Sequence, residues 1–286
     1  MRYYIATTTK FADQCLNHST CGASQSNWLA NINVGDIVFL SQFNYKSQNL
    51  FGPLRVSKNL FYNKDVIYPQ QKYFYRIQFN PINSIKCIEE TDLYINGIQS
   101  NNIPIYVRII NLIQQNKHLH CISLTASEGE ALSHVLERIG VNFNHERMNK
   151  LGGELTPVDR EYIWRKNRLD RRNTFSSESD LECYLIFSLK TPECQEYKGF
   201  QKLLSKYECN ELNFSEIYNQ FIFGNAYPCD ILILNQKNVN VFELKKINSH
   251  KTPFRKLRKR SRNIYIIQYI LIGQNQTAIY ADSIFI

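Results

Sequence analysis

The segment from Asp230 to Lys245 constrains the fold of this chain more than any other, because it predicts a complete β-hairpin. Two strand-like runs, Asp230–Leu234 and Val239–Leu244, are separated by four polar residues of the kind that form turns. If the runs pair as antiparallel strands, Asp230 comes to lie beside Glu243. Side chains alternate between the two faces of a strand, so Glu243 and Lys245 share one face while the residue between them turns into the core.

Two carboxylates and a lysine at one end of a hairpin suit the hydrolysis of phosphodiester bonds. That reaction uses Mg²⁺ ions to activate water and to neutralise charge that builds up on the phosphate. Mg²⁺ is usually bound by one or two carboxylates together with water molecules. Asp230 and Glu243 are therefore the expected metal ligands, and Lys245 is expected to orient or polarise the attacking water. Two acids and a lysine on a hairpin also arise by chance. A protein that has this arrangement but does not hydrolyse phosphodiester bonds therefore remains an alternative.

A helix is predicted before the hairpin, at Glu178–Leu189. Ser176 and Ser177 precede it, and Leu181, Tyr184, Leu185 and Leu189 recur on one side of the helix. Residues 178–245 therefore combine a helix and two strands, and each of these elements has an acidic residue.

This arrangement resembles the PD-(D/E)XK nuclease superfamily, with Asp230 in the first half of the motif and Glu243 and Lys245 in the second. The start of the helix is similar to that of the NucS-type and restriction-endonuclease branches, in which a helix glutamate completes the metal site. The resemblance implies that Glu178 has this role, with Glu182 as the second choice. It also implies Mg²⁺ as the cofactor, for which Mn²⁺ is an expected substitute.

Related families often place a glutamine on the element after the motif, and Gln268 is the fitting residue here. Its distance from Glu243 along the chain is longer than expected, and the segment Ile264–Ile272 reads as a strand as well as a helix. Gln268 is the last of the catalytic residues that the resemblance implies.

A basic segment follows the hairpin. Residues 245–262 contain nine Lys or Arg and no Asp or Glu, and the formal net charge of the whole chain is +9. Such a segment neutralises phosphates and makes binding fall steeply with salt. A solvated helix face is the alternative, although such faces usually mix charges. The predicted contacts with the DNA backbone are Lys246, Lys251, Arg255, Lys256, Arg258, Lys259, Arg260 and Arg262. The second basic run, residues 165–172, is a further candidate for contact with the DNA backbone, and a solvated surface is the equal alternative.

The first part of the chain reads as β-rich. Short apolar or aromatic runs are separated by Asn, Gly, Ser and Lys, which predicts several short strands and a small barrel. The expected strands are Tyr3–Thr7, Asp36–Ser41, Leu50–Ser57 and Tyr73–Phe79.

Residues 33–57 add a more specific pattern. A strand ends in Phe43 and Asn44, a polar turn follows, and Phe51 and Gly52 open the returning strand. This pattern resembles the PUA-like superfamily, closest to its EVE, YTH and DCD members. In the EVE and YTH branches an aromatic pocket holds a modified base that is flipped from the duplex or presented on a single strand. The resemblance implies a base-binding pocket made by Trp28, Ser41, Phe43, Asn44 and Tyr45. The alternative is that Trp28 is a core residue of the barrel.

The middle of the chain predicts two helices. Thr125 and Glu128 form a capping box, Leu132, Val135, Leu136 and Ile139 form an apolar stripe, and Gly140 stands at the stop position. A second helix is expected around Val158–Arg165. The expected fold is thus α/β (α+β), with a PUA-like β-barrel domain at residues 1–115, a helical connection at 116–173 and a PD-(D/E)XK restriction-endonuclease-like α/β domain at 174–286.

The composition indicates a globular protein, with 43% hydrophobic and 21% charged residues. The eight cysteines form no CxxC pair, no secretory leader opens the chain, and no apolar run reaches the length of a membrane span. We therefore expect unpaired thiols and a cytoplasmic protein without a membrane partner.

Together these features predict a DNA endonuclease whose N-terminal domain reads a modified base, which is the logic of a modification-dependent restriction enzyme in antiviral defence. DNA that carries modified bases is the expected partner. A homodimer is favoured for double-strand cutting, because one site per chain would cut one strand. The alternatives are a repair or structure-specific nuclease and a non-catalytic nucleic-acid-binding protein with a degenerate nuclease fold.

Overall fold

A computed structural model describes residues 1–8, 10–43, 48–69, 71–99, 103–116, 120–144, 151–168, 175, 177–205, 216–222, 228–234, 239–245, 265–272 and 276–283. The chain divides into two compact units, each of which contains helices and strands, so the fold is mixed α/β. Unit 1 comprises Met1–Val158 and Ile222–Tyr227, and unit 2 comprises Asp159–Phe221 and Pro228–Ile286. The division differs from the expected boundaries at 115 and 173, because the expected connection supplies elements to both units.

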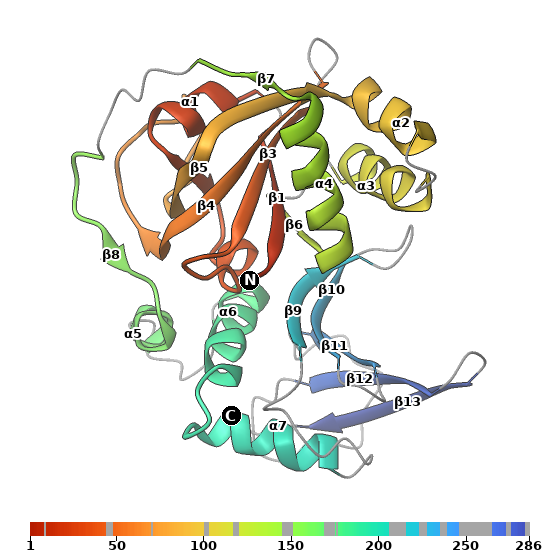
Figure 1. The fold of residues 1–286 in the computed structure, drawn as a ribbon. Helices are drawn as coiled ribbons and strands as arrows, with labels where there is room; N and C mark the ends of the chain where they lie inside the picture. Colours follow the sequence, from red (N-terminus) through yellow and green to blue (C-terminus); the bar gives the residue numbers. More distant parts are fainter. Residues whose placement is uncertain are drawn as a thin grey trace. The chain divides into compact units, whose positions relative to one another are not determined.

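Unit 1 is built on an eight-stranded sheet that curls into a half-barrel (Figure 1). The main path of the sheet runs β2-β5-β4-β3-β1-β6, with β7 paired to β5 and β8 to β4. β1 lies parallel to β3 and antiparallel to β6. The strands are β1 (Tyr3–Thr7), β2 (Thr20–Ala23), β3 (Ile37–Phe43), β4 (Gln48–Tyr62), β5 (Tyr75–Glu89), β6 (Cys121–Leu124), β7 (Val141–Asn142) and β8 (Thr156–Pro157).

Helices of unit 1 pack against this sheet and enclose an apolar core that draws residues from β1, β3, β6, α3 and α4. The predicted capping box begins α4, because the Thr125 hydroxyl accepts from the N–H of Glu128 and the Glu128 carboxylate accepts from the N–H of Thr125. The predicted stripe on α4 is buried except for Ile139, which is 42% exposed. The helices are α1 (Ala12–Asn17), the 3-10 helix η1 (Asn27–Leu29), α2 (Glu90–Gln99), α3 (Ile103–Gln115) and α4 (Ala126–Ile139).

Gly129 allows α4 to approach β1 closely. A Cβ atom added at Gly129 would lie 1.9 Å from Cγ of Tyr3. No real pair of carbon atoms comes that close without a bond, so a side chain at this position requires the helix or the tyrosine to move.

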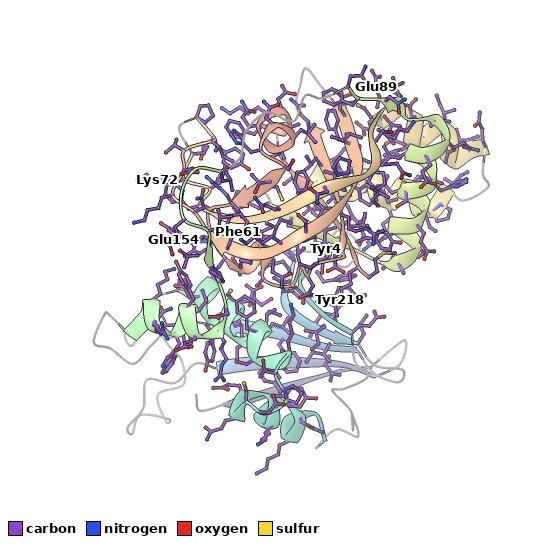
Figure 2. The ribbon with its side chains drawn as sticks, turned by 60° about the vertical axis from the view of Figure 1, so that its left-hand side comes forward. Tyr4, Phe61, Lys72, Glu89, Glu154 and Tyr218 are labelled. Atoms are coloured by element: carbon purple, nitrogen blue, oxygen red, sulfur yellow. The ribbon has the colours of Figure 1, made fainter. Side chains whose placement is uncertain are left out.

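Unit 2 contains a five-stranded antiparallel sheet whose strands follow one another in chain order (Figure 1). α6 packs against β10 and β11, and Phe200 of α7 meets the ring of Phe242 on β11 at 5.3 Å. An apolar cluster in this unit includes Leu232 and Tyr218, which pair across β10 and β9. Tyr218 is labelled in Figure 2. The elements are α5 (Arg160–Arg168), α6 (Glu178–Leu189), α7 (Gln195–Ser205), β9 (Glu216–Phe221), β10 (Cys229–Leu234), β11 (Val239–Lys245), β12 (Tyr265–Ile272) and β13 (Gln276–Ser283).

The predicted helix and hairpin are present in unit 2. α6 spans the expected residues, and its N-cap hydroxyl, on Ser177, accepts from the N–H of Asp180 at 3.1 Å. β10 and β11 form the expected antiparallel pair, and β12 shows that the segment around Gln268 is a strand.

Two further expectations concern unpaired cysteines and membrane-spanning segments. The cysteines that the structure describes form no disulfide. Among the described residues, no helix combines the length and apolar character that crossing a membrane requires.

Candidate functional site

Asp230 and Glu243 stand at the same level of the hairpin. Ile231 pairs with Phe242, so the next residues outward, Asp230 and Glu243, oppose each other. Leu244 is 1% exposed, in agreement with the expected alternation. Oδ2 of Asp230 accepts a hydrogen bond from the N–H of Leu244 at 2.6 Å. The side chains of Glu243 and Lys245 lie outside the described residues, so the pairing of the two acids rests on the backbone register.

α6 brings Glu182 to the neighbouring strand, β9. The Glu182 side chain is in the interior, with the residue 2% exposed. Its Oε2 accepts from Nε2 of Gln220 at 2.9 Å, and its Oε1 accepts from Nδ2 of Asn219 at 3.4 Å. Glu178, one helical turn earlier, is exposed. The geometry therefore favours Glu182, the second choice from the sequence, over Glu178 as the helix carboxylate.

Gln220 connects this glutamate with Asp230. Besides its bond to Glu182, Nε2 of Gln220 donates to Oδ1 of Asp230 at 3.4 Å. The register agrees, since Phe221 pairs with Cys229 and Asn219 pairs with Ile231 on either side of this position. Gln220 thus stands opposite Asp230 on one side, as Glu243 does on the other. Gln220 was not a candidate from the sequence, because no local pattern distinguishes it from other strand glutamines.

The donor set suits a hard divalent cation. The carboxylates of Glu182 and Asp230 share one amide group, and Mg²⁺ is usually held by one or two carboxylates with water in the other positions. Within the part of the chain that the structure describes, no group of three or more His, Cys, Asp or Glu side chains is arranged to hold a metal. A third carboxylate would have to come from Glu243, whose position the register supplies.

The remaining predicted residues of unit 2 are only partly described. Gln268 pairs with Phe242, whereas the partner of Glu243 on β12 is Ile267, so Gln268 is one position away from the row that contains the acids. Lys245 pairs with Tyr265. The basic residues proposed to contact the DNA backbone, Lys246 to Arg262, lie outside the described residues.

The second basic run is partly engaged in ion pairs. Arg165 pairs with Glu161 on α5, and Nζ of Lys166 lies 2.9 Å from Oδ1 of Asp180 on α6. Asp180 is buried, so Lys166 helps to join α5 to α6. These pairings weaken the case for phosphate contacts at the start of the run. Its later residues, 169–172, lie outside the described part.

In unit 1, Trp28 belongs to an aromatic group centred on His120. The Trp28 ring meets the His120 ring at 6.1 Å, and the Tyr73 ring meets it at 5.0 Å, both edge to face. Ser24 lies 3.2 Å from Nε2 of the histidine. Burial lowers the pKa of His120 to about 4, so the imidazole is neutral near pH 7. Trp28 is half-buried and also packs against the apolar core, which agrees with the alternative that it is a core residue, whereas base binding by Trp28 stays a prediction.

Ser41 lies at the same end of the unit 1 sheet. It pairs with Thr7 of β1, and the N–H of Thr7 donates to the carbonyl of His120 at 3.1 Å. Ser41 is 1% exposed, and its hydroxyl has no hydrogen-bond partner among the described residues. Phe43 ends β3, but its side chain and the whole of Asn44 and Tyr45 lie outside the described part.

Ser24, Tyr73 and His120 were not predicted from the sequence. They come from three segments that are far apart along the chain and share no spacing that would group them. The antiparallel pairing of β2 with β5, in which Ala23 lies opposite Tyr75, brings Ser24 close to Tyr73, and His120 directly precedes β6.

Comparison of the chain with models of known protein families, with curated proteins and with solved structures finds no match. The functional assignment therefore depends on the geometry of the site and on the sequence motifs.

Proposed function

We propose that this protein is a Mg²⁺-dependent DNA endonuclease. The observation that carries the proposal is the contact network of unit 2, in which one amide group, on Gln220, joins a helix carboxylate, Glu182, to the hairpin carboxylate Asp230. The hairpin register adds Glu243 beside Asp230. A helix acid and two strand acids, followed by a lysine on the Glu243 face, form the combination that resembles the PD-(D/E)XK nucleases.

Each residue has a defined part in the proposed reaction. Glu182, Asp230 and Glu243 would hold Mg²⁺, which supplies charge neutralisation at the phosphate when it is bound. Lys245 orients and polarises the water that attacks phosphorus. The hydrogen bond from the Leu244 N–H to Asp230 holds this carboxylate at the end of its strand, so its orientation is set before substrate arrives.

DNA as the substrate is supported by charge. The nine cationic residues at 245–262 equal the net charge of the whole chain, +9, and they follow the proposed metal ligand Glu243 directly. A cationic segment of this density binds phosphates in any sequence and provides affinity rather than specificity.

We propose further that unit 1 supplies specificity as a reader of a modified base. The aromatic group around His120 offers ring surfaces and a neutral imidazole. The hydroxyl of Ser41 at the same end of the sheet is buried and unpartnered among the described residues, so a base edge would bind it only after the surrounding side chains move aside. A nuclease joined to such a reader is a modification-dependent restriction enzyme.

Cleavage of matched DNA duplexes tests this function. Duplexes of one sequence, with unmodified cytosine, 5-methylcytosine or 5-hydroxymethylcytosine, are incubated with the protein and Mg²⁺, and products are resolved by electrophoresis. We expect cleavage that EDTA abolishes and that is faster on one modified duplex. Replacement of Trp28 by Ala should remove the preference and leave the slower cleavage of unmodified DNA.

Other outcomes identify the alternatives. Equal rates on all duplexes would contradict the restriction function and favour a repair or structure-specific nuclease. DNA binding without cleavage of any duplex, with either Mg²⁺ or Mn²⁺, would favour a non-catalytic binding protein.

A further inference from the structure

Gln220 has a backbone conformation that ordinary strand residues avoid. Its φ is 51°, in the left-handed region where the Cβ of an L-residue crowds the following carbonyl group. Asn and Asp are the non-glycine residues that tolerate this region best, and a glutamine there is unusual. Strained residues of this kind tend to cluster at functional sites, where the surrounding structure holds them.

The strained backbone has a direct effect on the side chains of β9. In a regular strand, adjacent residues point to opposite faces of the sheet. The amides of Asn219 and Gln220 nevertheless both donate to the carboxylate of Glu182. The positive φ at Gln220 breaks the alternation and turns two consecutive amides toward the same acid on α6.

The Gln220 amide then acts on two carboxylates at once. An amide nitrogen carries two hydrogens, and here Nε2 lies 2.9 Å from Oε2 of Glu182 and 3.4 Å from Oδ1 of Asp230. The opposite ends of both acids are also held, by Asn219 at Oε1 of Glu182 and by the Leu244 N–H at Oδ2 of Asp230. Gln220 is 8% exposed, so the bridge is largely shielded from water.

We propose that Gln220 is a positioning residue that presets the spacing of Glu182 and Asp230 for a divalent cation. The inference rests on the proposed function, because it assigns metal binding to these two acids. Residues that orient metal ligands without touching the metal typically change metal affinity when they are replaced. The competing explanation is structural: the amide would satisfy buried polar groups and have no influence on the metal.

Two substitutions separate these explanations. Gln220→Met keeps the length of the side chain and removes both donors. Gln220→Gly removes the side chain and relieves the backbone strain, because glycine adopts positive φ readily. Gln195→Met is the matched control, since Gln195 is an exposed glutamine on α7 of the same unit. Gln220→Asn is the conservative variant, which keeps an amide and tolerates the left-handed backbone.

The experiment measures Mn²⁺ binding to the full-length protein by calorimetry, with circular dichroism to establish that each variant is folded. For Gln220→Met and Gln220→Gly we expect the dissociation constant for Mn²⁺ to rise about tenfold or more. For Gln195→Met no change is expected, and Gln220→Asn should recover part of the affinity. In the cleavage assay, the Mg²⁺ concentration for half-maximal rate should rise in parallel, with a much smaller loss of rate at saturating Mg²⁺.

The possible failures are distinguishable. If the wild-type protein binds Mn²⁺ and both Gln220→Met and Gln220→Gly bind it equally well, the positioning role is wrong and the proposed function stands. If the wild-type protein neither binds Mn²⁺ nor cleaves DNA, the proposed function is wrong and the inference falls with it. Should Gln220→Met fail to fold, Gln220→Gly decides the question, because it removes the strain together with the amide.

Discussion

Glu178 and Glu182 lie one helical turn apart on α6, and their surroundings differ sharply. Residues at this spacing share a helix face, so the sequence pattern alone could not decide which of them is directed to the hairpin. The structure places Glu182 in the interior, in contact with Gln220, and Glu178 at the exposed start of the helix. Which turn of α6 packs against the strands decides which glutamate is buried, and the periodicity of the sequence does not reveal this.

The two glutamates therefore have opposite expected phenotypes. Glu182→Gln should lower the rate of Mg²⁺-dependent cleavage by roughly a thousandfold, because loss of a metal ligand removes several kcal/mol of charge stabilisation and each 1.4 kcal/mol corresponds to about tenfold in rate. Glu178→Gln, the matched control on the same helix, should change the rate by less than about threefold, since an exposed surface substitution has little effect. Initial rates on one DNA duplex provide the comparison. Equal losses in the two variants would contradict the assignment of Glu182.

At the scale of secondary structure, the elements that carry local signals were predictable. α6 has its N-cap at Ser177, and the hairpin strands β10 and β11 alternate around a polar turn, so their positions followed from the sequence. β12 was ambiguous because its run of apolar residues lacks a helix cap and a strand alternation. The strained conformation of Gln220 was not predictable, since it depends on contacts with α6 and β10 that form only in the folded unit.

The packing of α4 against β1 gives a prediction at this scale. Alanine at a helix interior is favoured over glycine by about 1 kcal/mol. At Gly129 the added methyl group would overlap Tyr3, and overpacking of this kind typically costs about 1–3 kcal/mol or more. The difference between these two terms leads us to expect that Gly129→Ala lowers the free energy of unfolding of unit 1 by up to about 2 kcal/mol.

Gly199→Ala on α7 is the matched control, because nothing lies within 4 Å of the added Cβ. It should raise the free energy of unfolding of unit 2 by about 0.5–1 kcal/mol. Urea unfolding followed by tryptophan fluorescence measures the free energy of unfolding of each unit, since Trp28 belongs to unit 1 and Trp164 to unit 2. Stabilisation by both substitutions would show that α4 does not approach β1 as closely as described.

At the scale of the whole molecule, the sequence predicted two functional regions but not the course of the chain between them. The expected connection at 116–173 instead contributes β6 and α4 to unit 1 and α5 to unit 2, and unit 1 also includes Ile222. Ile222 joins the apolar core that the helices α3 and α4 cover in unit 1. Long-range strand pairings, such as that of β1 with β6, determine which unit each element belongs to. These pairings leave no local signature in the sequence. The residues around His120 were missed for the same reason.

Mg²⁺-dependent DNA cleavage by the wild-type protein and by Asp230→Asn, measured side by side, tests the central claim most directly. The asparagine carbonyl can still accept the hydrogen bond from the Leu244 N–H that Asp230 accepts now, and only the longer bond from Gln220 is lost, so the fold should persist while the charge is lost. We predict cleavage by the wild-type protein, abolished by EDTA, and a loss of roughly a thousandfold in the variant, with unchanged circular dichroism. Equal cleavage by both proteins, or none by the wild-type protein with Mg²⁺ or Mn²⁺ on any duplex, would contradict the account.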